Sequence, residues 1–279
     1  MVRFSLILAT VGRTDDFGRF LTSLRNQTYR DFELIVVDQN PDDRLAPILA
    51  PYESVFRILH LRSEARGASR ARNLGLQHIS GEAVAFPDDD CLYPPDTLAT
   101  SARLLANHPE WDGLTGRSVD EAGRTSMGRF SERPGGLDKI SAWLRGIEYT
   151  IFLRAACVKE TRFDEELGVG AGTPWGAGEG TDLLLRLLER GASLNYDPNL
   201  VVVHPWRSPP YDERAMRRAY SYGCGMGRTL KKHRMPPWFK AKWLIRPLGG
   251  ALLSLLGRRL REAKYRWETF RGRLRGVLS

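Results

Sequence analysis

Short runs of apolar residues alternate with amphipathic stretches through the first hundred residues of the chain. The apolar runs are typical of buried strands, whereas the stretches between them repeat apolar positions at helical spacing. This alternation predicts βαβ units and a mostly parallel sheet flanked by helices, an α/β fold. The predicted strands are 3–9, 33–37, 56–61 and 83–86, and the predicted helices lie near 16–26, 44–52, 69–78 and 95–107.

The second half of the chain keeps this character but has longer irregular stretches. A helix is expected to begin near residue 181, where leucines recur at helical spacing. The segment 168–178 is dense in glycine, and two interpretations stay open, a lid over a bound ligand or a flexible connector. Strands are expected at 113–119, 147–156, 193–196 and 200–204.

Charge divides the chain of 279 residues into two parts. The net charge is +9, but residues 207–279 alone hold 19 Lys and Arg against 4 Asp and Glu. We therefore expect one α/β domain at 1–206, with halves at 1–110 and 111–206, and a basic helical tail at 207–279.

The three cysteines and the N-terminus bear on the compartment. Cys91, Cys157 and Cys224 are widely spaced and form no CxxC pair, so neither a disulfide framework nor a zinc ribbon is indicated. The first residues predict a strand rather than a secretory signal, because polar residues follow too soon. A cytoplasmic location is expected.

Three consecutive aspartates, Asp88, Asp89 and Asp90, follow the predicted strand at 83–86. Crowding carboxylates at the end of a buried strand is unfavourable unless a positive charge balances them. A hard divalent cation such as Mg²⁺ or Mn²⁺ takes oxygen ligands and bridges carboxylates to substrate phosphates. We expect a metal site here, and the alternative is a solvated acidic turn.

Polar residues also follow the first two predicted strands. Thr10, Val11 and Arg13 follow the first strand, and Asp38 follows the second. Ligands of open α/β sheets bind beyond the carboxyl ends of the strands, so these residues are candidates for a binding site. The Asp38 carboxylate suits hydrogen bonds from a nucleobase or a ribose, or it caps the loop that follows.

The start of the predicted helix 69–78 is a third candidate. Small residues after Gly67 and the guanidinium groups of Arg70 and Arg72 lie there. Helix N-termini attract phosphate, and arginine binds phosphate with a bidentate fork. Both guanidinium groups are therefore candidates for phosphate contacts, and the alternative for Arg70 is a solvated surface charge.

Five motifs in a fixed order resemble the family 2 glycosyltransferases of bacterial type, which have the GT-A fold. Each motif alone is weak, but the order and spacing are specific and span about residues 3–206. The resemblance implies a Rossmann-like mixed sheet flanked by helices, with a nucleotide-sugar bound by 1–110 and an acceptor by 111–206. The motifs are 5–10 with Arg13, 24–29 before 33–38, 67–75, 86–90 and 178–182.

The resemblance also implies roles for single residues. Arg72 and Asn73 match the family's donor-contacting Ala-Arg-Asn, and Asp88 would face the ribose. Asp90 would be the second acid of the DxD motif that holds the metal against the diphosphate. His204 would complete the metal shell or contact the diphosphate, unless it is structural. The expected nucleotide-sugar contacts are Thr10, Val11, Arg13, Asp38, Gly67, Arg72, Asn73, Asp88 and Asp89.

The catalytic base is where the chain departs from the family. Glycosyl transfer needs a carboxylate to deprotonate the acceptor hydroxyl. The family's Gly-Glu-Asp triplet ends in the acid commonly assigned this task, but here Gly180 takes its place. Glu179 is the first candidate and Asp182 the second, although Asp182 equally suits a structural charge at a helix N-terminus.

The tail combines basic and aromatic residues with an apolar part at 248–256. That part is shorter than the about 20 residues that a bilayer-spanning helix needs. Trp238, Trp243 and Trp267 suit headgroup depth, and Lys and Arg suit anionic lipid, so peripheral binding to the inner face of the cell membrane is expected. Packing on the domain or an oligomer interface stays open. Nucleic acid is not expected, because no helix-turn-helix, RRM or zinc-finger signature occurs.

The predicted function is a metal-dependent, inverting glycosyltransferase. It would move a hexosyl or related group from a nucleoside diphosphate-sugar to a hydroxyl of a glycan or lipid-linked acceptor, as in polysaccharide biosynthesis. A sugar-phosphate nucleotidyltransferase is a second hypothesis, although its Gly-rich, Arg-containing loop after the first strand is lacking. A non-catalytic membrane-binding scaffold is a third, because Gly180 replaces an acid.

Overall fold

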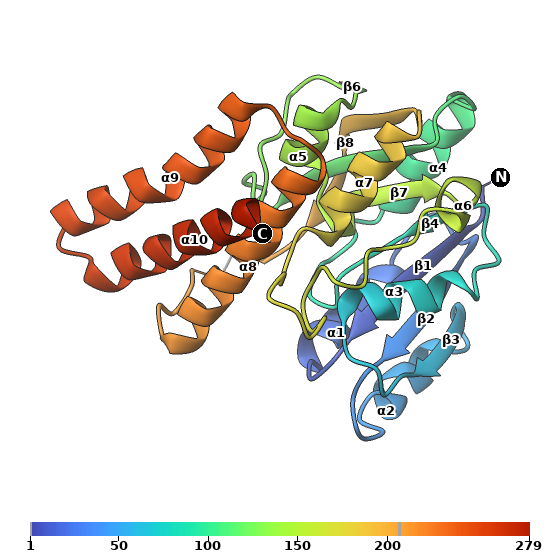
Figure 1. Ribbon diagram of the computed structural model, residues 1–279. Coiled ribbons are helices and arrows are strands. Elements are labelled where there is room, and N and C mark those ends of the chain that lie inside the picture. The colour runs from blue at the N-terminus through green and yellow to red at the C-terminus, as the bar shows by residue number, and fades with distance from the viewer. Residues whose placement is uncertain (1, 206–207) are drawn as a thin grey trace.

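The computed structural model describes residues 2–205 and 208–279, so the predicted boundary at 206/207 lies outside the described residues. A mixed sheet of order β3-β2-β1-β4-β7-β5-β8-β6 forms its centre (Figure 1). This confirms the predicted α/β class. The strands are β1 Phe4–Thr10, β2 Phe32–Asp38, β3 Arg57–Arg62, β4 Ala83–Ala85, β5 Gly113–Val119, β6 Gly135–Gly136, β7 Ile151–Arg154 and β8 Leu194–Val203.

Helices cover both faces of the sheet because successive residues of a buried strand point to opposite sides. Leu6 of β1 belongs to the same buried cluster as Phe20 of α1, whereas Ile7 belongs to the cluster that holds Ala71 of α3. The helices are α1 Asp15–Arg25, α2 Ala46–Leu49, α3 Ala68–Leu76, α4 Thr97–Asn107, α5 Lys139–Arg145, α6 Ala155–Lys159, α7 Glu179–Glu189, α8 Glu213–Lys232, α9 Pro237–Leu256 and α10 Leu260–Leu278, with 3-10 turns η1 Ala50–Tyr52 and η2 Glu148–Thr150.

Parallel pairing brings the polar strand ends together. β1 pairs in parallel with β2 so that Thr10 lies opposite Asp38, and β4 pairs in parallel with the other side of β1. The carboxyl ends of these strands therefore meet at one edge of the sheet. The loops 10–13, 38–40 and 86–90 all begin at this edge.

One predicted strand, 147–156, is divided in the structure. Its first residues form η2, in which the Thr150 backbone N–H and hydroxyl donate to the Ile147 carbonyl at 2.9 and 2.8 Å. Its last residues begin α6. Only β7 between them is a strand, because the local hydrogen bonds of Thr150 turn the chain before it enters the sheet.

The two predicted strands at 193–196 and 200–204 form one strand, β8. Pro198 and Asn199 are turn formers, but the chain stays extended through them. A register shift between Thr115 and Arg117 of β5 accommodates this irregularity. The residue between them is glycine, and a Cβ there would lie only 2.7 Å from Leu200 Cγ.

The helices α8, α9 and α10 form the predicted helical extension, and α8 and α10 contact each other through glycines. A Cβ at Gly223 would lie 2.6 Å from the Thr269 carbonyl oxygen, and one at Gly227 would lie 3.0 Å from Gly276 Cα. Such small-residue faces let two helix backbones approach closely. Phe239 of α9 is buried beside Trp143 of the domain, with ring centroids 5.9 Å apart, so the extension also packs on the domain.

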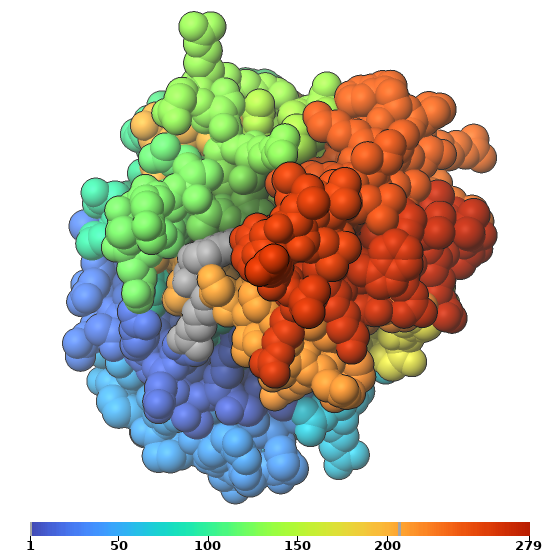
Figure 2. All heavy atoms as spheres, turned by 90° about the vertical axis from the view of Figure 1, so that its left-hand side faces the viewer, coloured from blue at the N-terminus to red at the C-terminus, as the bar shows by residue number. Residues whose placement is uncertain are grey.

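The strands β1 and β2 run toward the left of Figure 1, and the α9–α10 turn projects on the same side. Seen from that side, the orange and red helices lie beside the blue N-terminal region and the green segment of the second half (Figure 2). Among the described residues, the longest apolar stretches of the helices remain too short or too polar to cross a bilayer.

Candidate active site

The aspartates after β4 are held by residues that follow β1. The Thr10 hydroxyl donates to Asp89 Oδ2 at 2.6 Å, and the Arg13 guanidinium pairs with Asp89 and, at 2.7 Å, with Asp90. The residues predicted at the first and fourth strand ends therefore meet, as the strand-end argument requires. Val11 lies on the open rim of this site and is 44% exposed.

Asp88, Asp90 and His204 could hold a metal ion. One ligand atom from each lies within 4.8 Å of the others. His204 Nε2 is 3.2 Å from Asp90 Oδ1, and the His204 ring stacks on Tyr149 with centroids 4.8 Å apart. The two carboxylates suit Mn²⁺ or Mg²⁺, and the imidazole nitrogen favours the transition metal Mn²⁺ of these two.

The pKa values show why a cation suits this cluster. Burial, opposed by Arg72, raises the pKa of Asp88 to about 6. For Asp90 the hydrogen bond and charge of His204 outweigh burial and lower the pKa. A divalent cation would favour the anionic form of Asp88, which burial alone disfavours.

At the nucleoside end, Asp38 makes contacts of the kind expected for the loop-capping alternative, and its contact with a nucleoside stays a prediction. This carboxylate is fully buried, and Asn40 donates to it from its backbone and its side-chain amide at 2.8 and 2.7 Å. Its second oxygen lies 3.0 Å from His60 Nε2. Asn40 in turn accepts from the Gly12 backbone at 2.7 Å. In this structure Asp38 therefore orders the loops around the site and faces protein groups rather than open space.

Arg72 reaches the cluster from α3 and is 4% exposed. Its two terminal nitrogens donate to Asp88 at 3.0 Å and to Glu179 at 3.3 Å, while its Nε has no partner among the described residues. Asn73 points elsewhere, because its amide binds the backbone of Phe163 and the Glu165 carboxylate. Arg72 of this motif therefore contacts the acids of the site, whereas Asn73 binds the segment that precedes the glycine-rich loop.

The glycine-rich loop is tied to two helices. Gly67, with φ at +124°, backs against Gly170, and the Ala68 N–H donates to the Val169 carbonyl at 2.9 Å. On the other side, the Gly176 N–H donates to the Ser221 carbonyl of α8 at 3.1 Å. These bonds fasten the loop to α3 and α8, and both the lid and the flexible connector stay predictions.

The two predicted base candidates at the start of α7 lie in different surroundings. Glu179 contacts Arg72, and burial together with the charge of Glu148 raises its pKa to about 7. Asp182 faces away from this cluster and is bound at 2.8 Å by Arg186, Lys232 and His233. Despite full burial, these partners lower the pKa of Asp182 to about 2.

A family model described as glycosyl transferase family 2 matches residues 5–152, more than half of the chain. The chain belongs to glycosyl transferase family 2. The resemblance inferred from the five motifs is thereby confirmed.

Two relatives of this family 2 chain have names that state a function. A glucosyl-dolichyl phosphate glucuronosyltransferase of Haloferax volcanii is 31% identical over 125 residues, 43% of this chain and 39% of that protein. A PGL/p-HBAD biosynthesis glycosyltransferase of Mycobacterium bovis is 34% identical over 117 residues, 40% of this chain and 45% of that protein. The matched region is less than half the length of each relative.

Solved structures show that the fold of this family 2 protein is GT-A. The mannosyltransferase PcManGT of Pyrobaculum calidifontis, in complex with GDP-Man and Mn²⁺, is similar with a TM-score of 0.69 over 98% of this chain and 87% of that one, at 18% identity. TarS 1-349 of S. aureus, in complex with UDP-GlcNAc, gives a TM-score of 0.63 over 96% and 90%, at 18% identity.

Sequence reasoning missed one residue of this family 2 site, Glu148. Its Oε1 accepts a hydrogen bond from the Gly180 N–H at 2.9 Å. A Cβ at Gly180 would lie 2.6 Å from Glu148 Cδ. The signal in the sequence was Gly180, because the space left by its missing side chain can be filled by an acid from another element. The spacing of residues does not show which element supplies that acid.

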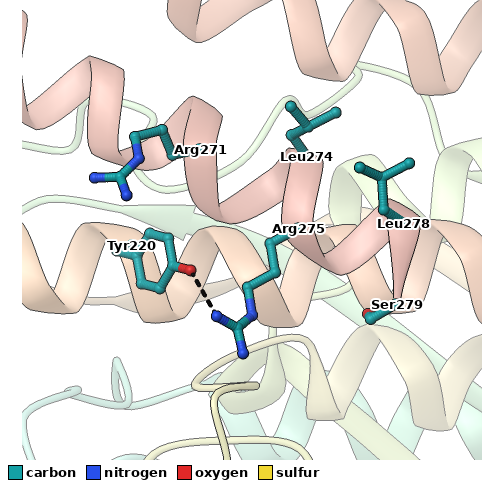
Figure 3. Close-up of a pocket in the computed structure, with 6 residues that line it drawn as sticks. All are labelled: Tyr220, Arg271, Leu274, Arg275, Leu278 and Ser279. Carbon is teal, nitrogen blue, oxygen red and sulfur yellow. Dashed lines mark hydrogen bonds between the residues drawn. The ribbon is translucent and has the colours of Figure 1, made fainter.

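The hollow drawn in Figure 3 lies outside this site. It has a volume of about 530 Å³ and is formed by α8 and α10, where Arg275 donates to the Tyr220 hydroxyl at 3.2 Å. None of the residues predicted to bind donor or metal lines it.

Proposed function

We propose that this protein is a metal-dependent, inverting glycosyltransferase that uses a nucleoside diphosphate-sugar donor and a hydroxyl of a glycan or lipid-linked acceptor. The observation that carries the proposal is the cluster of Asp88, Asp90 and His204 beside Arg13 and Arg72 at the strand ends. Family membership and the GT-A fold support a donor of this class.

The leaving diphosphate is the charge that this cluster would balance. Asp90 and His204, joined by Asp88, would hold Mn²⁺ or Mg²⁺, which supplies Lewis-acid neutralisation of the departing phosphate oxygens. Arg13 is 46% exposed on its side chain and can turn from Asp89 to a phosphate. Thr10 and Asp89 orient Arg13, and Val11 and Gly12 form the rim on which the nucleoside would rest.

Inversion follows from a single in-line displacement. An acid of the Glu148–Glu179 pair takes the proton from the acceptor hydroxyl while the bond to the diphosphate breaks. Asp182 is a poor base, because Arg186, Lys232 and His233 already bind its carboxylate. A product with the anomeric configuration of the donor would contradict this mechanism.

The donor test is thermal stabilisation by UDP, GDP, UDP-GlcNAc and GDP-Man, each with and without Mn²⁺. A ligand that binds only the folded state raises the melting temperature by mass action. We expect a shift with at least one of them that requires Mn²⁺ and is lost in Asp90→Asn. The control is Glu160→Gln, an acid whose side chain is 82% exposed and whose ion-pair partner is Arg190 rather than a residue of the cluster. No shift with any nucleotide would contradict the donor assignment.

The two rival hypotheses give different products. A sugar-phosphate nucleotidyltransferase releases pyrophosphate from a nucleoside triphosphate, whereas the proposed reaction releases a nucleoside diphosphate. A non-catalytic scaffold releases neither. Chromatography of the nucleotide products separates all three cases.

The helical extension supports binding to an anionic bilayer surface. Leucines around the α9–α10 turn are exposed, including Leu253 at 65% and Leu256 at 74%. Arg258, Arg259 and Arg261 are exposed beside them. Apolar side chains flanked by cations match acyl chains and anionic headgroups. The turn projects on the side to which the strand ends open (Figure 1), which suits a lipid-linked acceptor.

Vesicle sedimentation tests this surface. We expect binding to phosphatidylglycerol vesicles that weakens with salt, is weak on phosphatidylcholine, and falls about tenfold in the variant Leu253→Ser with Leu256→Ser. The matched control is Val55→Ser, an exposed apolar residue elsewhere. Self-association without vesicle binding would contradict the membrane assignment and identify an oligomer interface instead.

A further inference from the structure

We infer that Glu148 is the general base of the transfer, standing in the space that the side chain of residue 180 would otherwise fill. The inference rests on the proposed function and assigns the acid that the family motif lacks here. Glu148 lies in η2, directly before β7, and thus on a different element from the helix that carries Gly180.

The geometry of Gly180 carries this inference. A Cβ added there would lie 2.6 Å from Glu148 Cδ and 2.7 Å from Glu148 Oε1. The Gly180 N–H, at the first turn of α7, already donates to that oxygen at 2.9 Å. One carboxylate fits in this place and two do not, so glycine at 180 and glutamate at 148 are parts of one arrangement.

Glu148 shares its surroundings with the donor site. Its charge contributes to raising the pKa values of Asp88 and Glu179. The same charge favours the cationic form of Arg72, which lies between those two acids. The next residue, Tyr149, stacks on His204, so the backbone of η2 ties the position of Glu148 to the candidate metal ligand.

Glu179 is less suited to meet an acceptor. Its side chain is 9% exposed and is engaged by Arg72. Gly168 covers it, since a Cβ there would lie 2.9 Å from Glu179 Cδ. Glu148 is partly exposed, and among the described residues the Gly180 N–H is the only hydrogen-bond donor to its carboxylate. We therefore treat Glu179 as a positioning residue for Arg72.

The transfer is a single displacement at the anomeric carbon. The acceptor hydroxyl gives its proton to a Glu148 carboxylate oxygen as its own oxygen forms the bond to the anomeric carbon. The bond from that carbon to the diphosphate oxygen breaks, and its electron pair leaves on the diphosphate. The protonated Glu148 then releases its proton to water.

Moving the acid back to α7 tests the inference. The variants are Glu148→Gln, Glu148→Ala, Gly180→Asp, and Glu148→Ala combined with Gly180→Asp. The assay measures nucleoside diphosphate release from UDP-GlcNAc and GDP-Man with Mn²⁺, with water as the acceptor. Melting temperature and nucleotide binding show that each variant is folded and keeps its donor site.

We expect Glu148→Gln to lower kcat by about 10²- to 10⁴-fold with little change in donor KM, because the amide keeps the hydrogen bond to Gly180 but accepts no proton. Gly180→Asp alone crowds Glu148 and loses activity. The combined variant is expected to regain at least about tenfold over Glu148→Ala, because a carboxylate returns to the same space.

Two results would overturn the inference. The first is Glu148→Gln within about threefold of the wild type, and the second is a folded, donor-binding combined variant no faster than Glu148→Ala. A wild type that neither binds nor cleaves any nucleotide-sugar contradicts the proposed function itself. That result is separable, because it is seen before any variant is made.

Discussion

Glu179 and Asp182 lie three residues apart in the first turn of α7, both are buried, and their environments are opposite. Around Glu179 the acids Asp88 and Glu148 outnumber the single guanidinium of Arg72. Around Asp182, by contrast, Arg186, Lys232 and His233 all bind its carboxylate directly. The pKa is raised to about 7 on one side and lowered to about 2 on the other.

This difference distinguishes an acid of the candidate active site, Glu179, from an acid that stabilises the fold, Asp182. A cluster with more acids than cations is stable only when it binds a cation or a proton, as is typical of a ligand-binding site. A carboxylate surrounded by cations is already balanced, so it fastens elements together. Asp182 joins α7 to the end of α8, where Lys232 and His233 lie.

The largest effect on stability is expected from removing the carboxylate of Asp182, whose charge its neighbours balance. Asp182→Asn removes the fully buried carboxylate that Arg186, Lys232 and His233 share and should lower the free energy of unfolding by about 3 kcal/mol. Urea denaturation at pH 7 measures it. The activity of the protein that remains folded should change less than threefold, and a selective loss of kcat would instead make Asp182 part of the chemistry.

A smaller effect of opposite sign is expected at Glu179. Its folded pKa of about 7 lies above the ordinary value of 4.5, so its stabilisation is complete at low pH and is lost as the pH rises through 7. In metal-free protein at pH 8, Glu179→Gln should therefore raise the free energy of unfolding by about 2 kcal/mol. At pH 4 the variant and the wild type should agree, and equal stability at both pH values would refute the raised pKa.

The smallest effect is expected at the edge of the Asp182 cluster. Lys232 is 31% exposed on its side chain and bridges Asp182 and Asp164. Lys232→Gln should lower the free energy of unfolding by about 1 kcal/mol, because Arg186 and His233 still hold Asp182. A loss as large as that of Asp182→Asn would show that the ammonium alone balances the carboxylate.

The fold was largely predictable because β1, β2 and β4 are apolar runs buried on both faces. Their carboxyl ends also predicted the meeting of Thr10, Arg13 and the aspartates. The prediction was wrong at 147–156, where local hydrogen bonds override the apolar pattern, and at 193–204, where a register shift in β5 keeps the chain extended through the turn formers Pro198 and Asn199.

The surroundings of the two α7 acids could not be predicted from spacing. The partner His233 lies 51 residues after Asp182, and Glu148 lies 32 residues before Gly180. Each contact depends on how whole elements approach one another. The spacing of Gly223 with Gly227 and of Gly272 with Gly276 was a usable signal for the α8–α10 contact, because small residues four apart form one helix face.

The glycine contact between α8 and α10 makes the helical extension a rigid strut rather than a flexible tether. Two helices whose backbones touch cannot flex independently, and Phe239 of α9, the helix that connects them, packs against Trp143 of the domain. On the proposed bilayer, a strut of fixed length would hold the site at one height above the lipid. Acceptors would then be sorted by how far their hydroxyl stands from the surface, a selection by reach that no residue of the site itself performs.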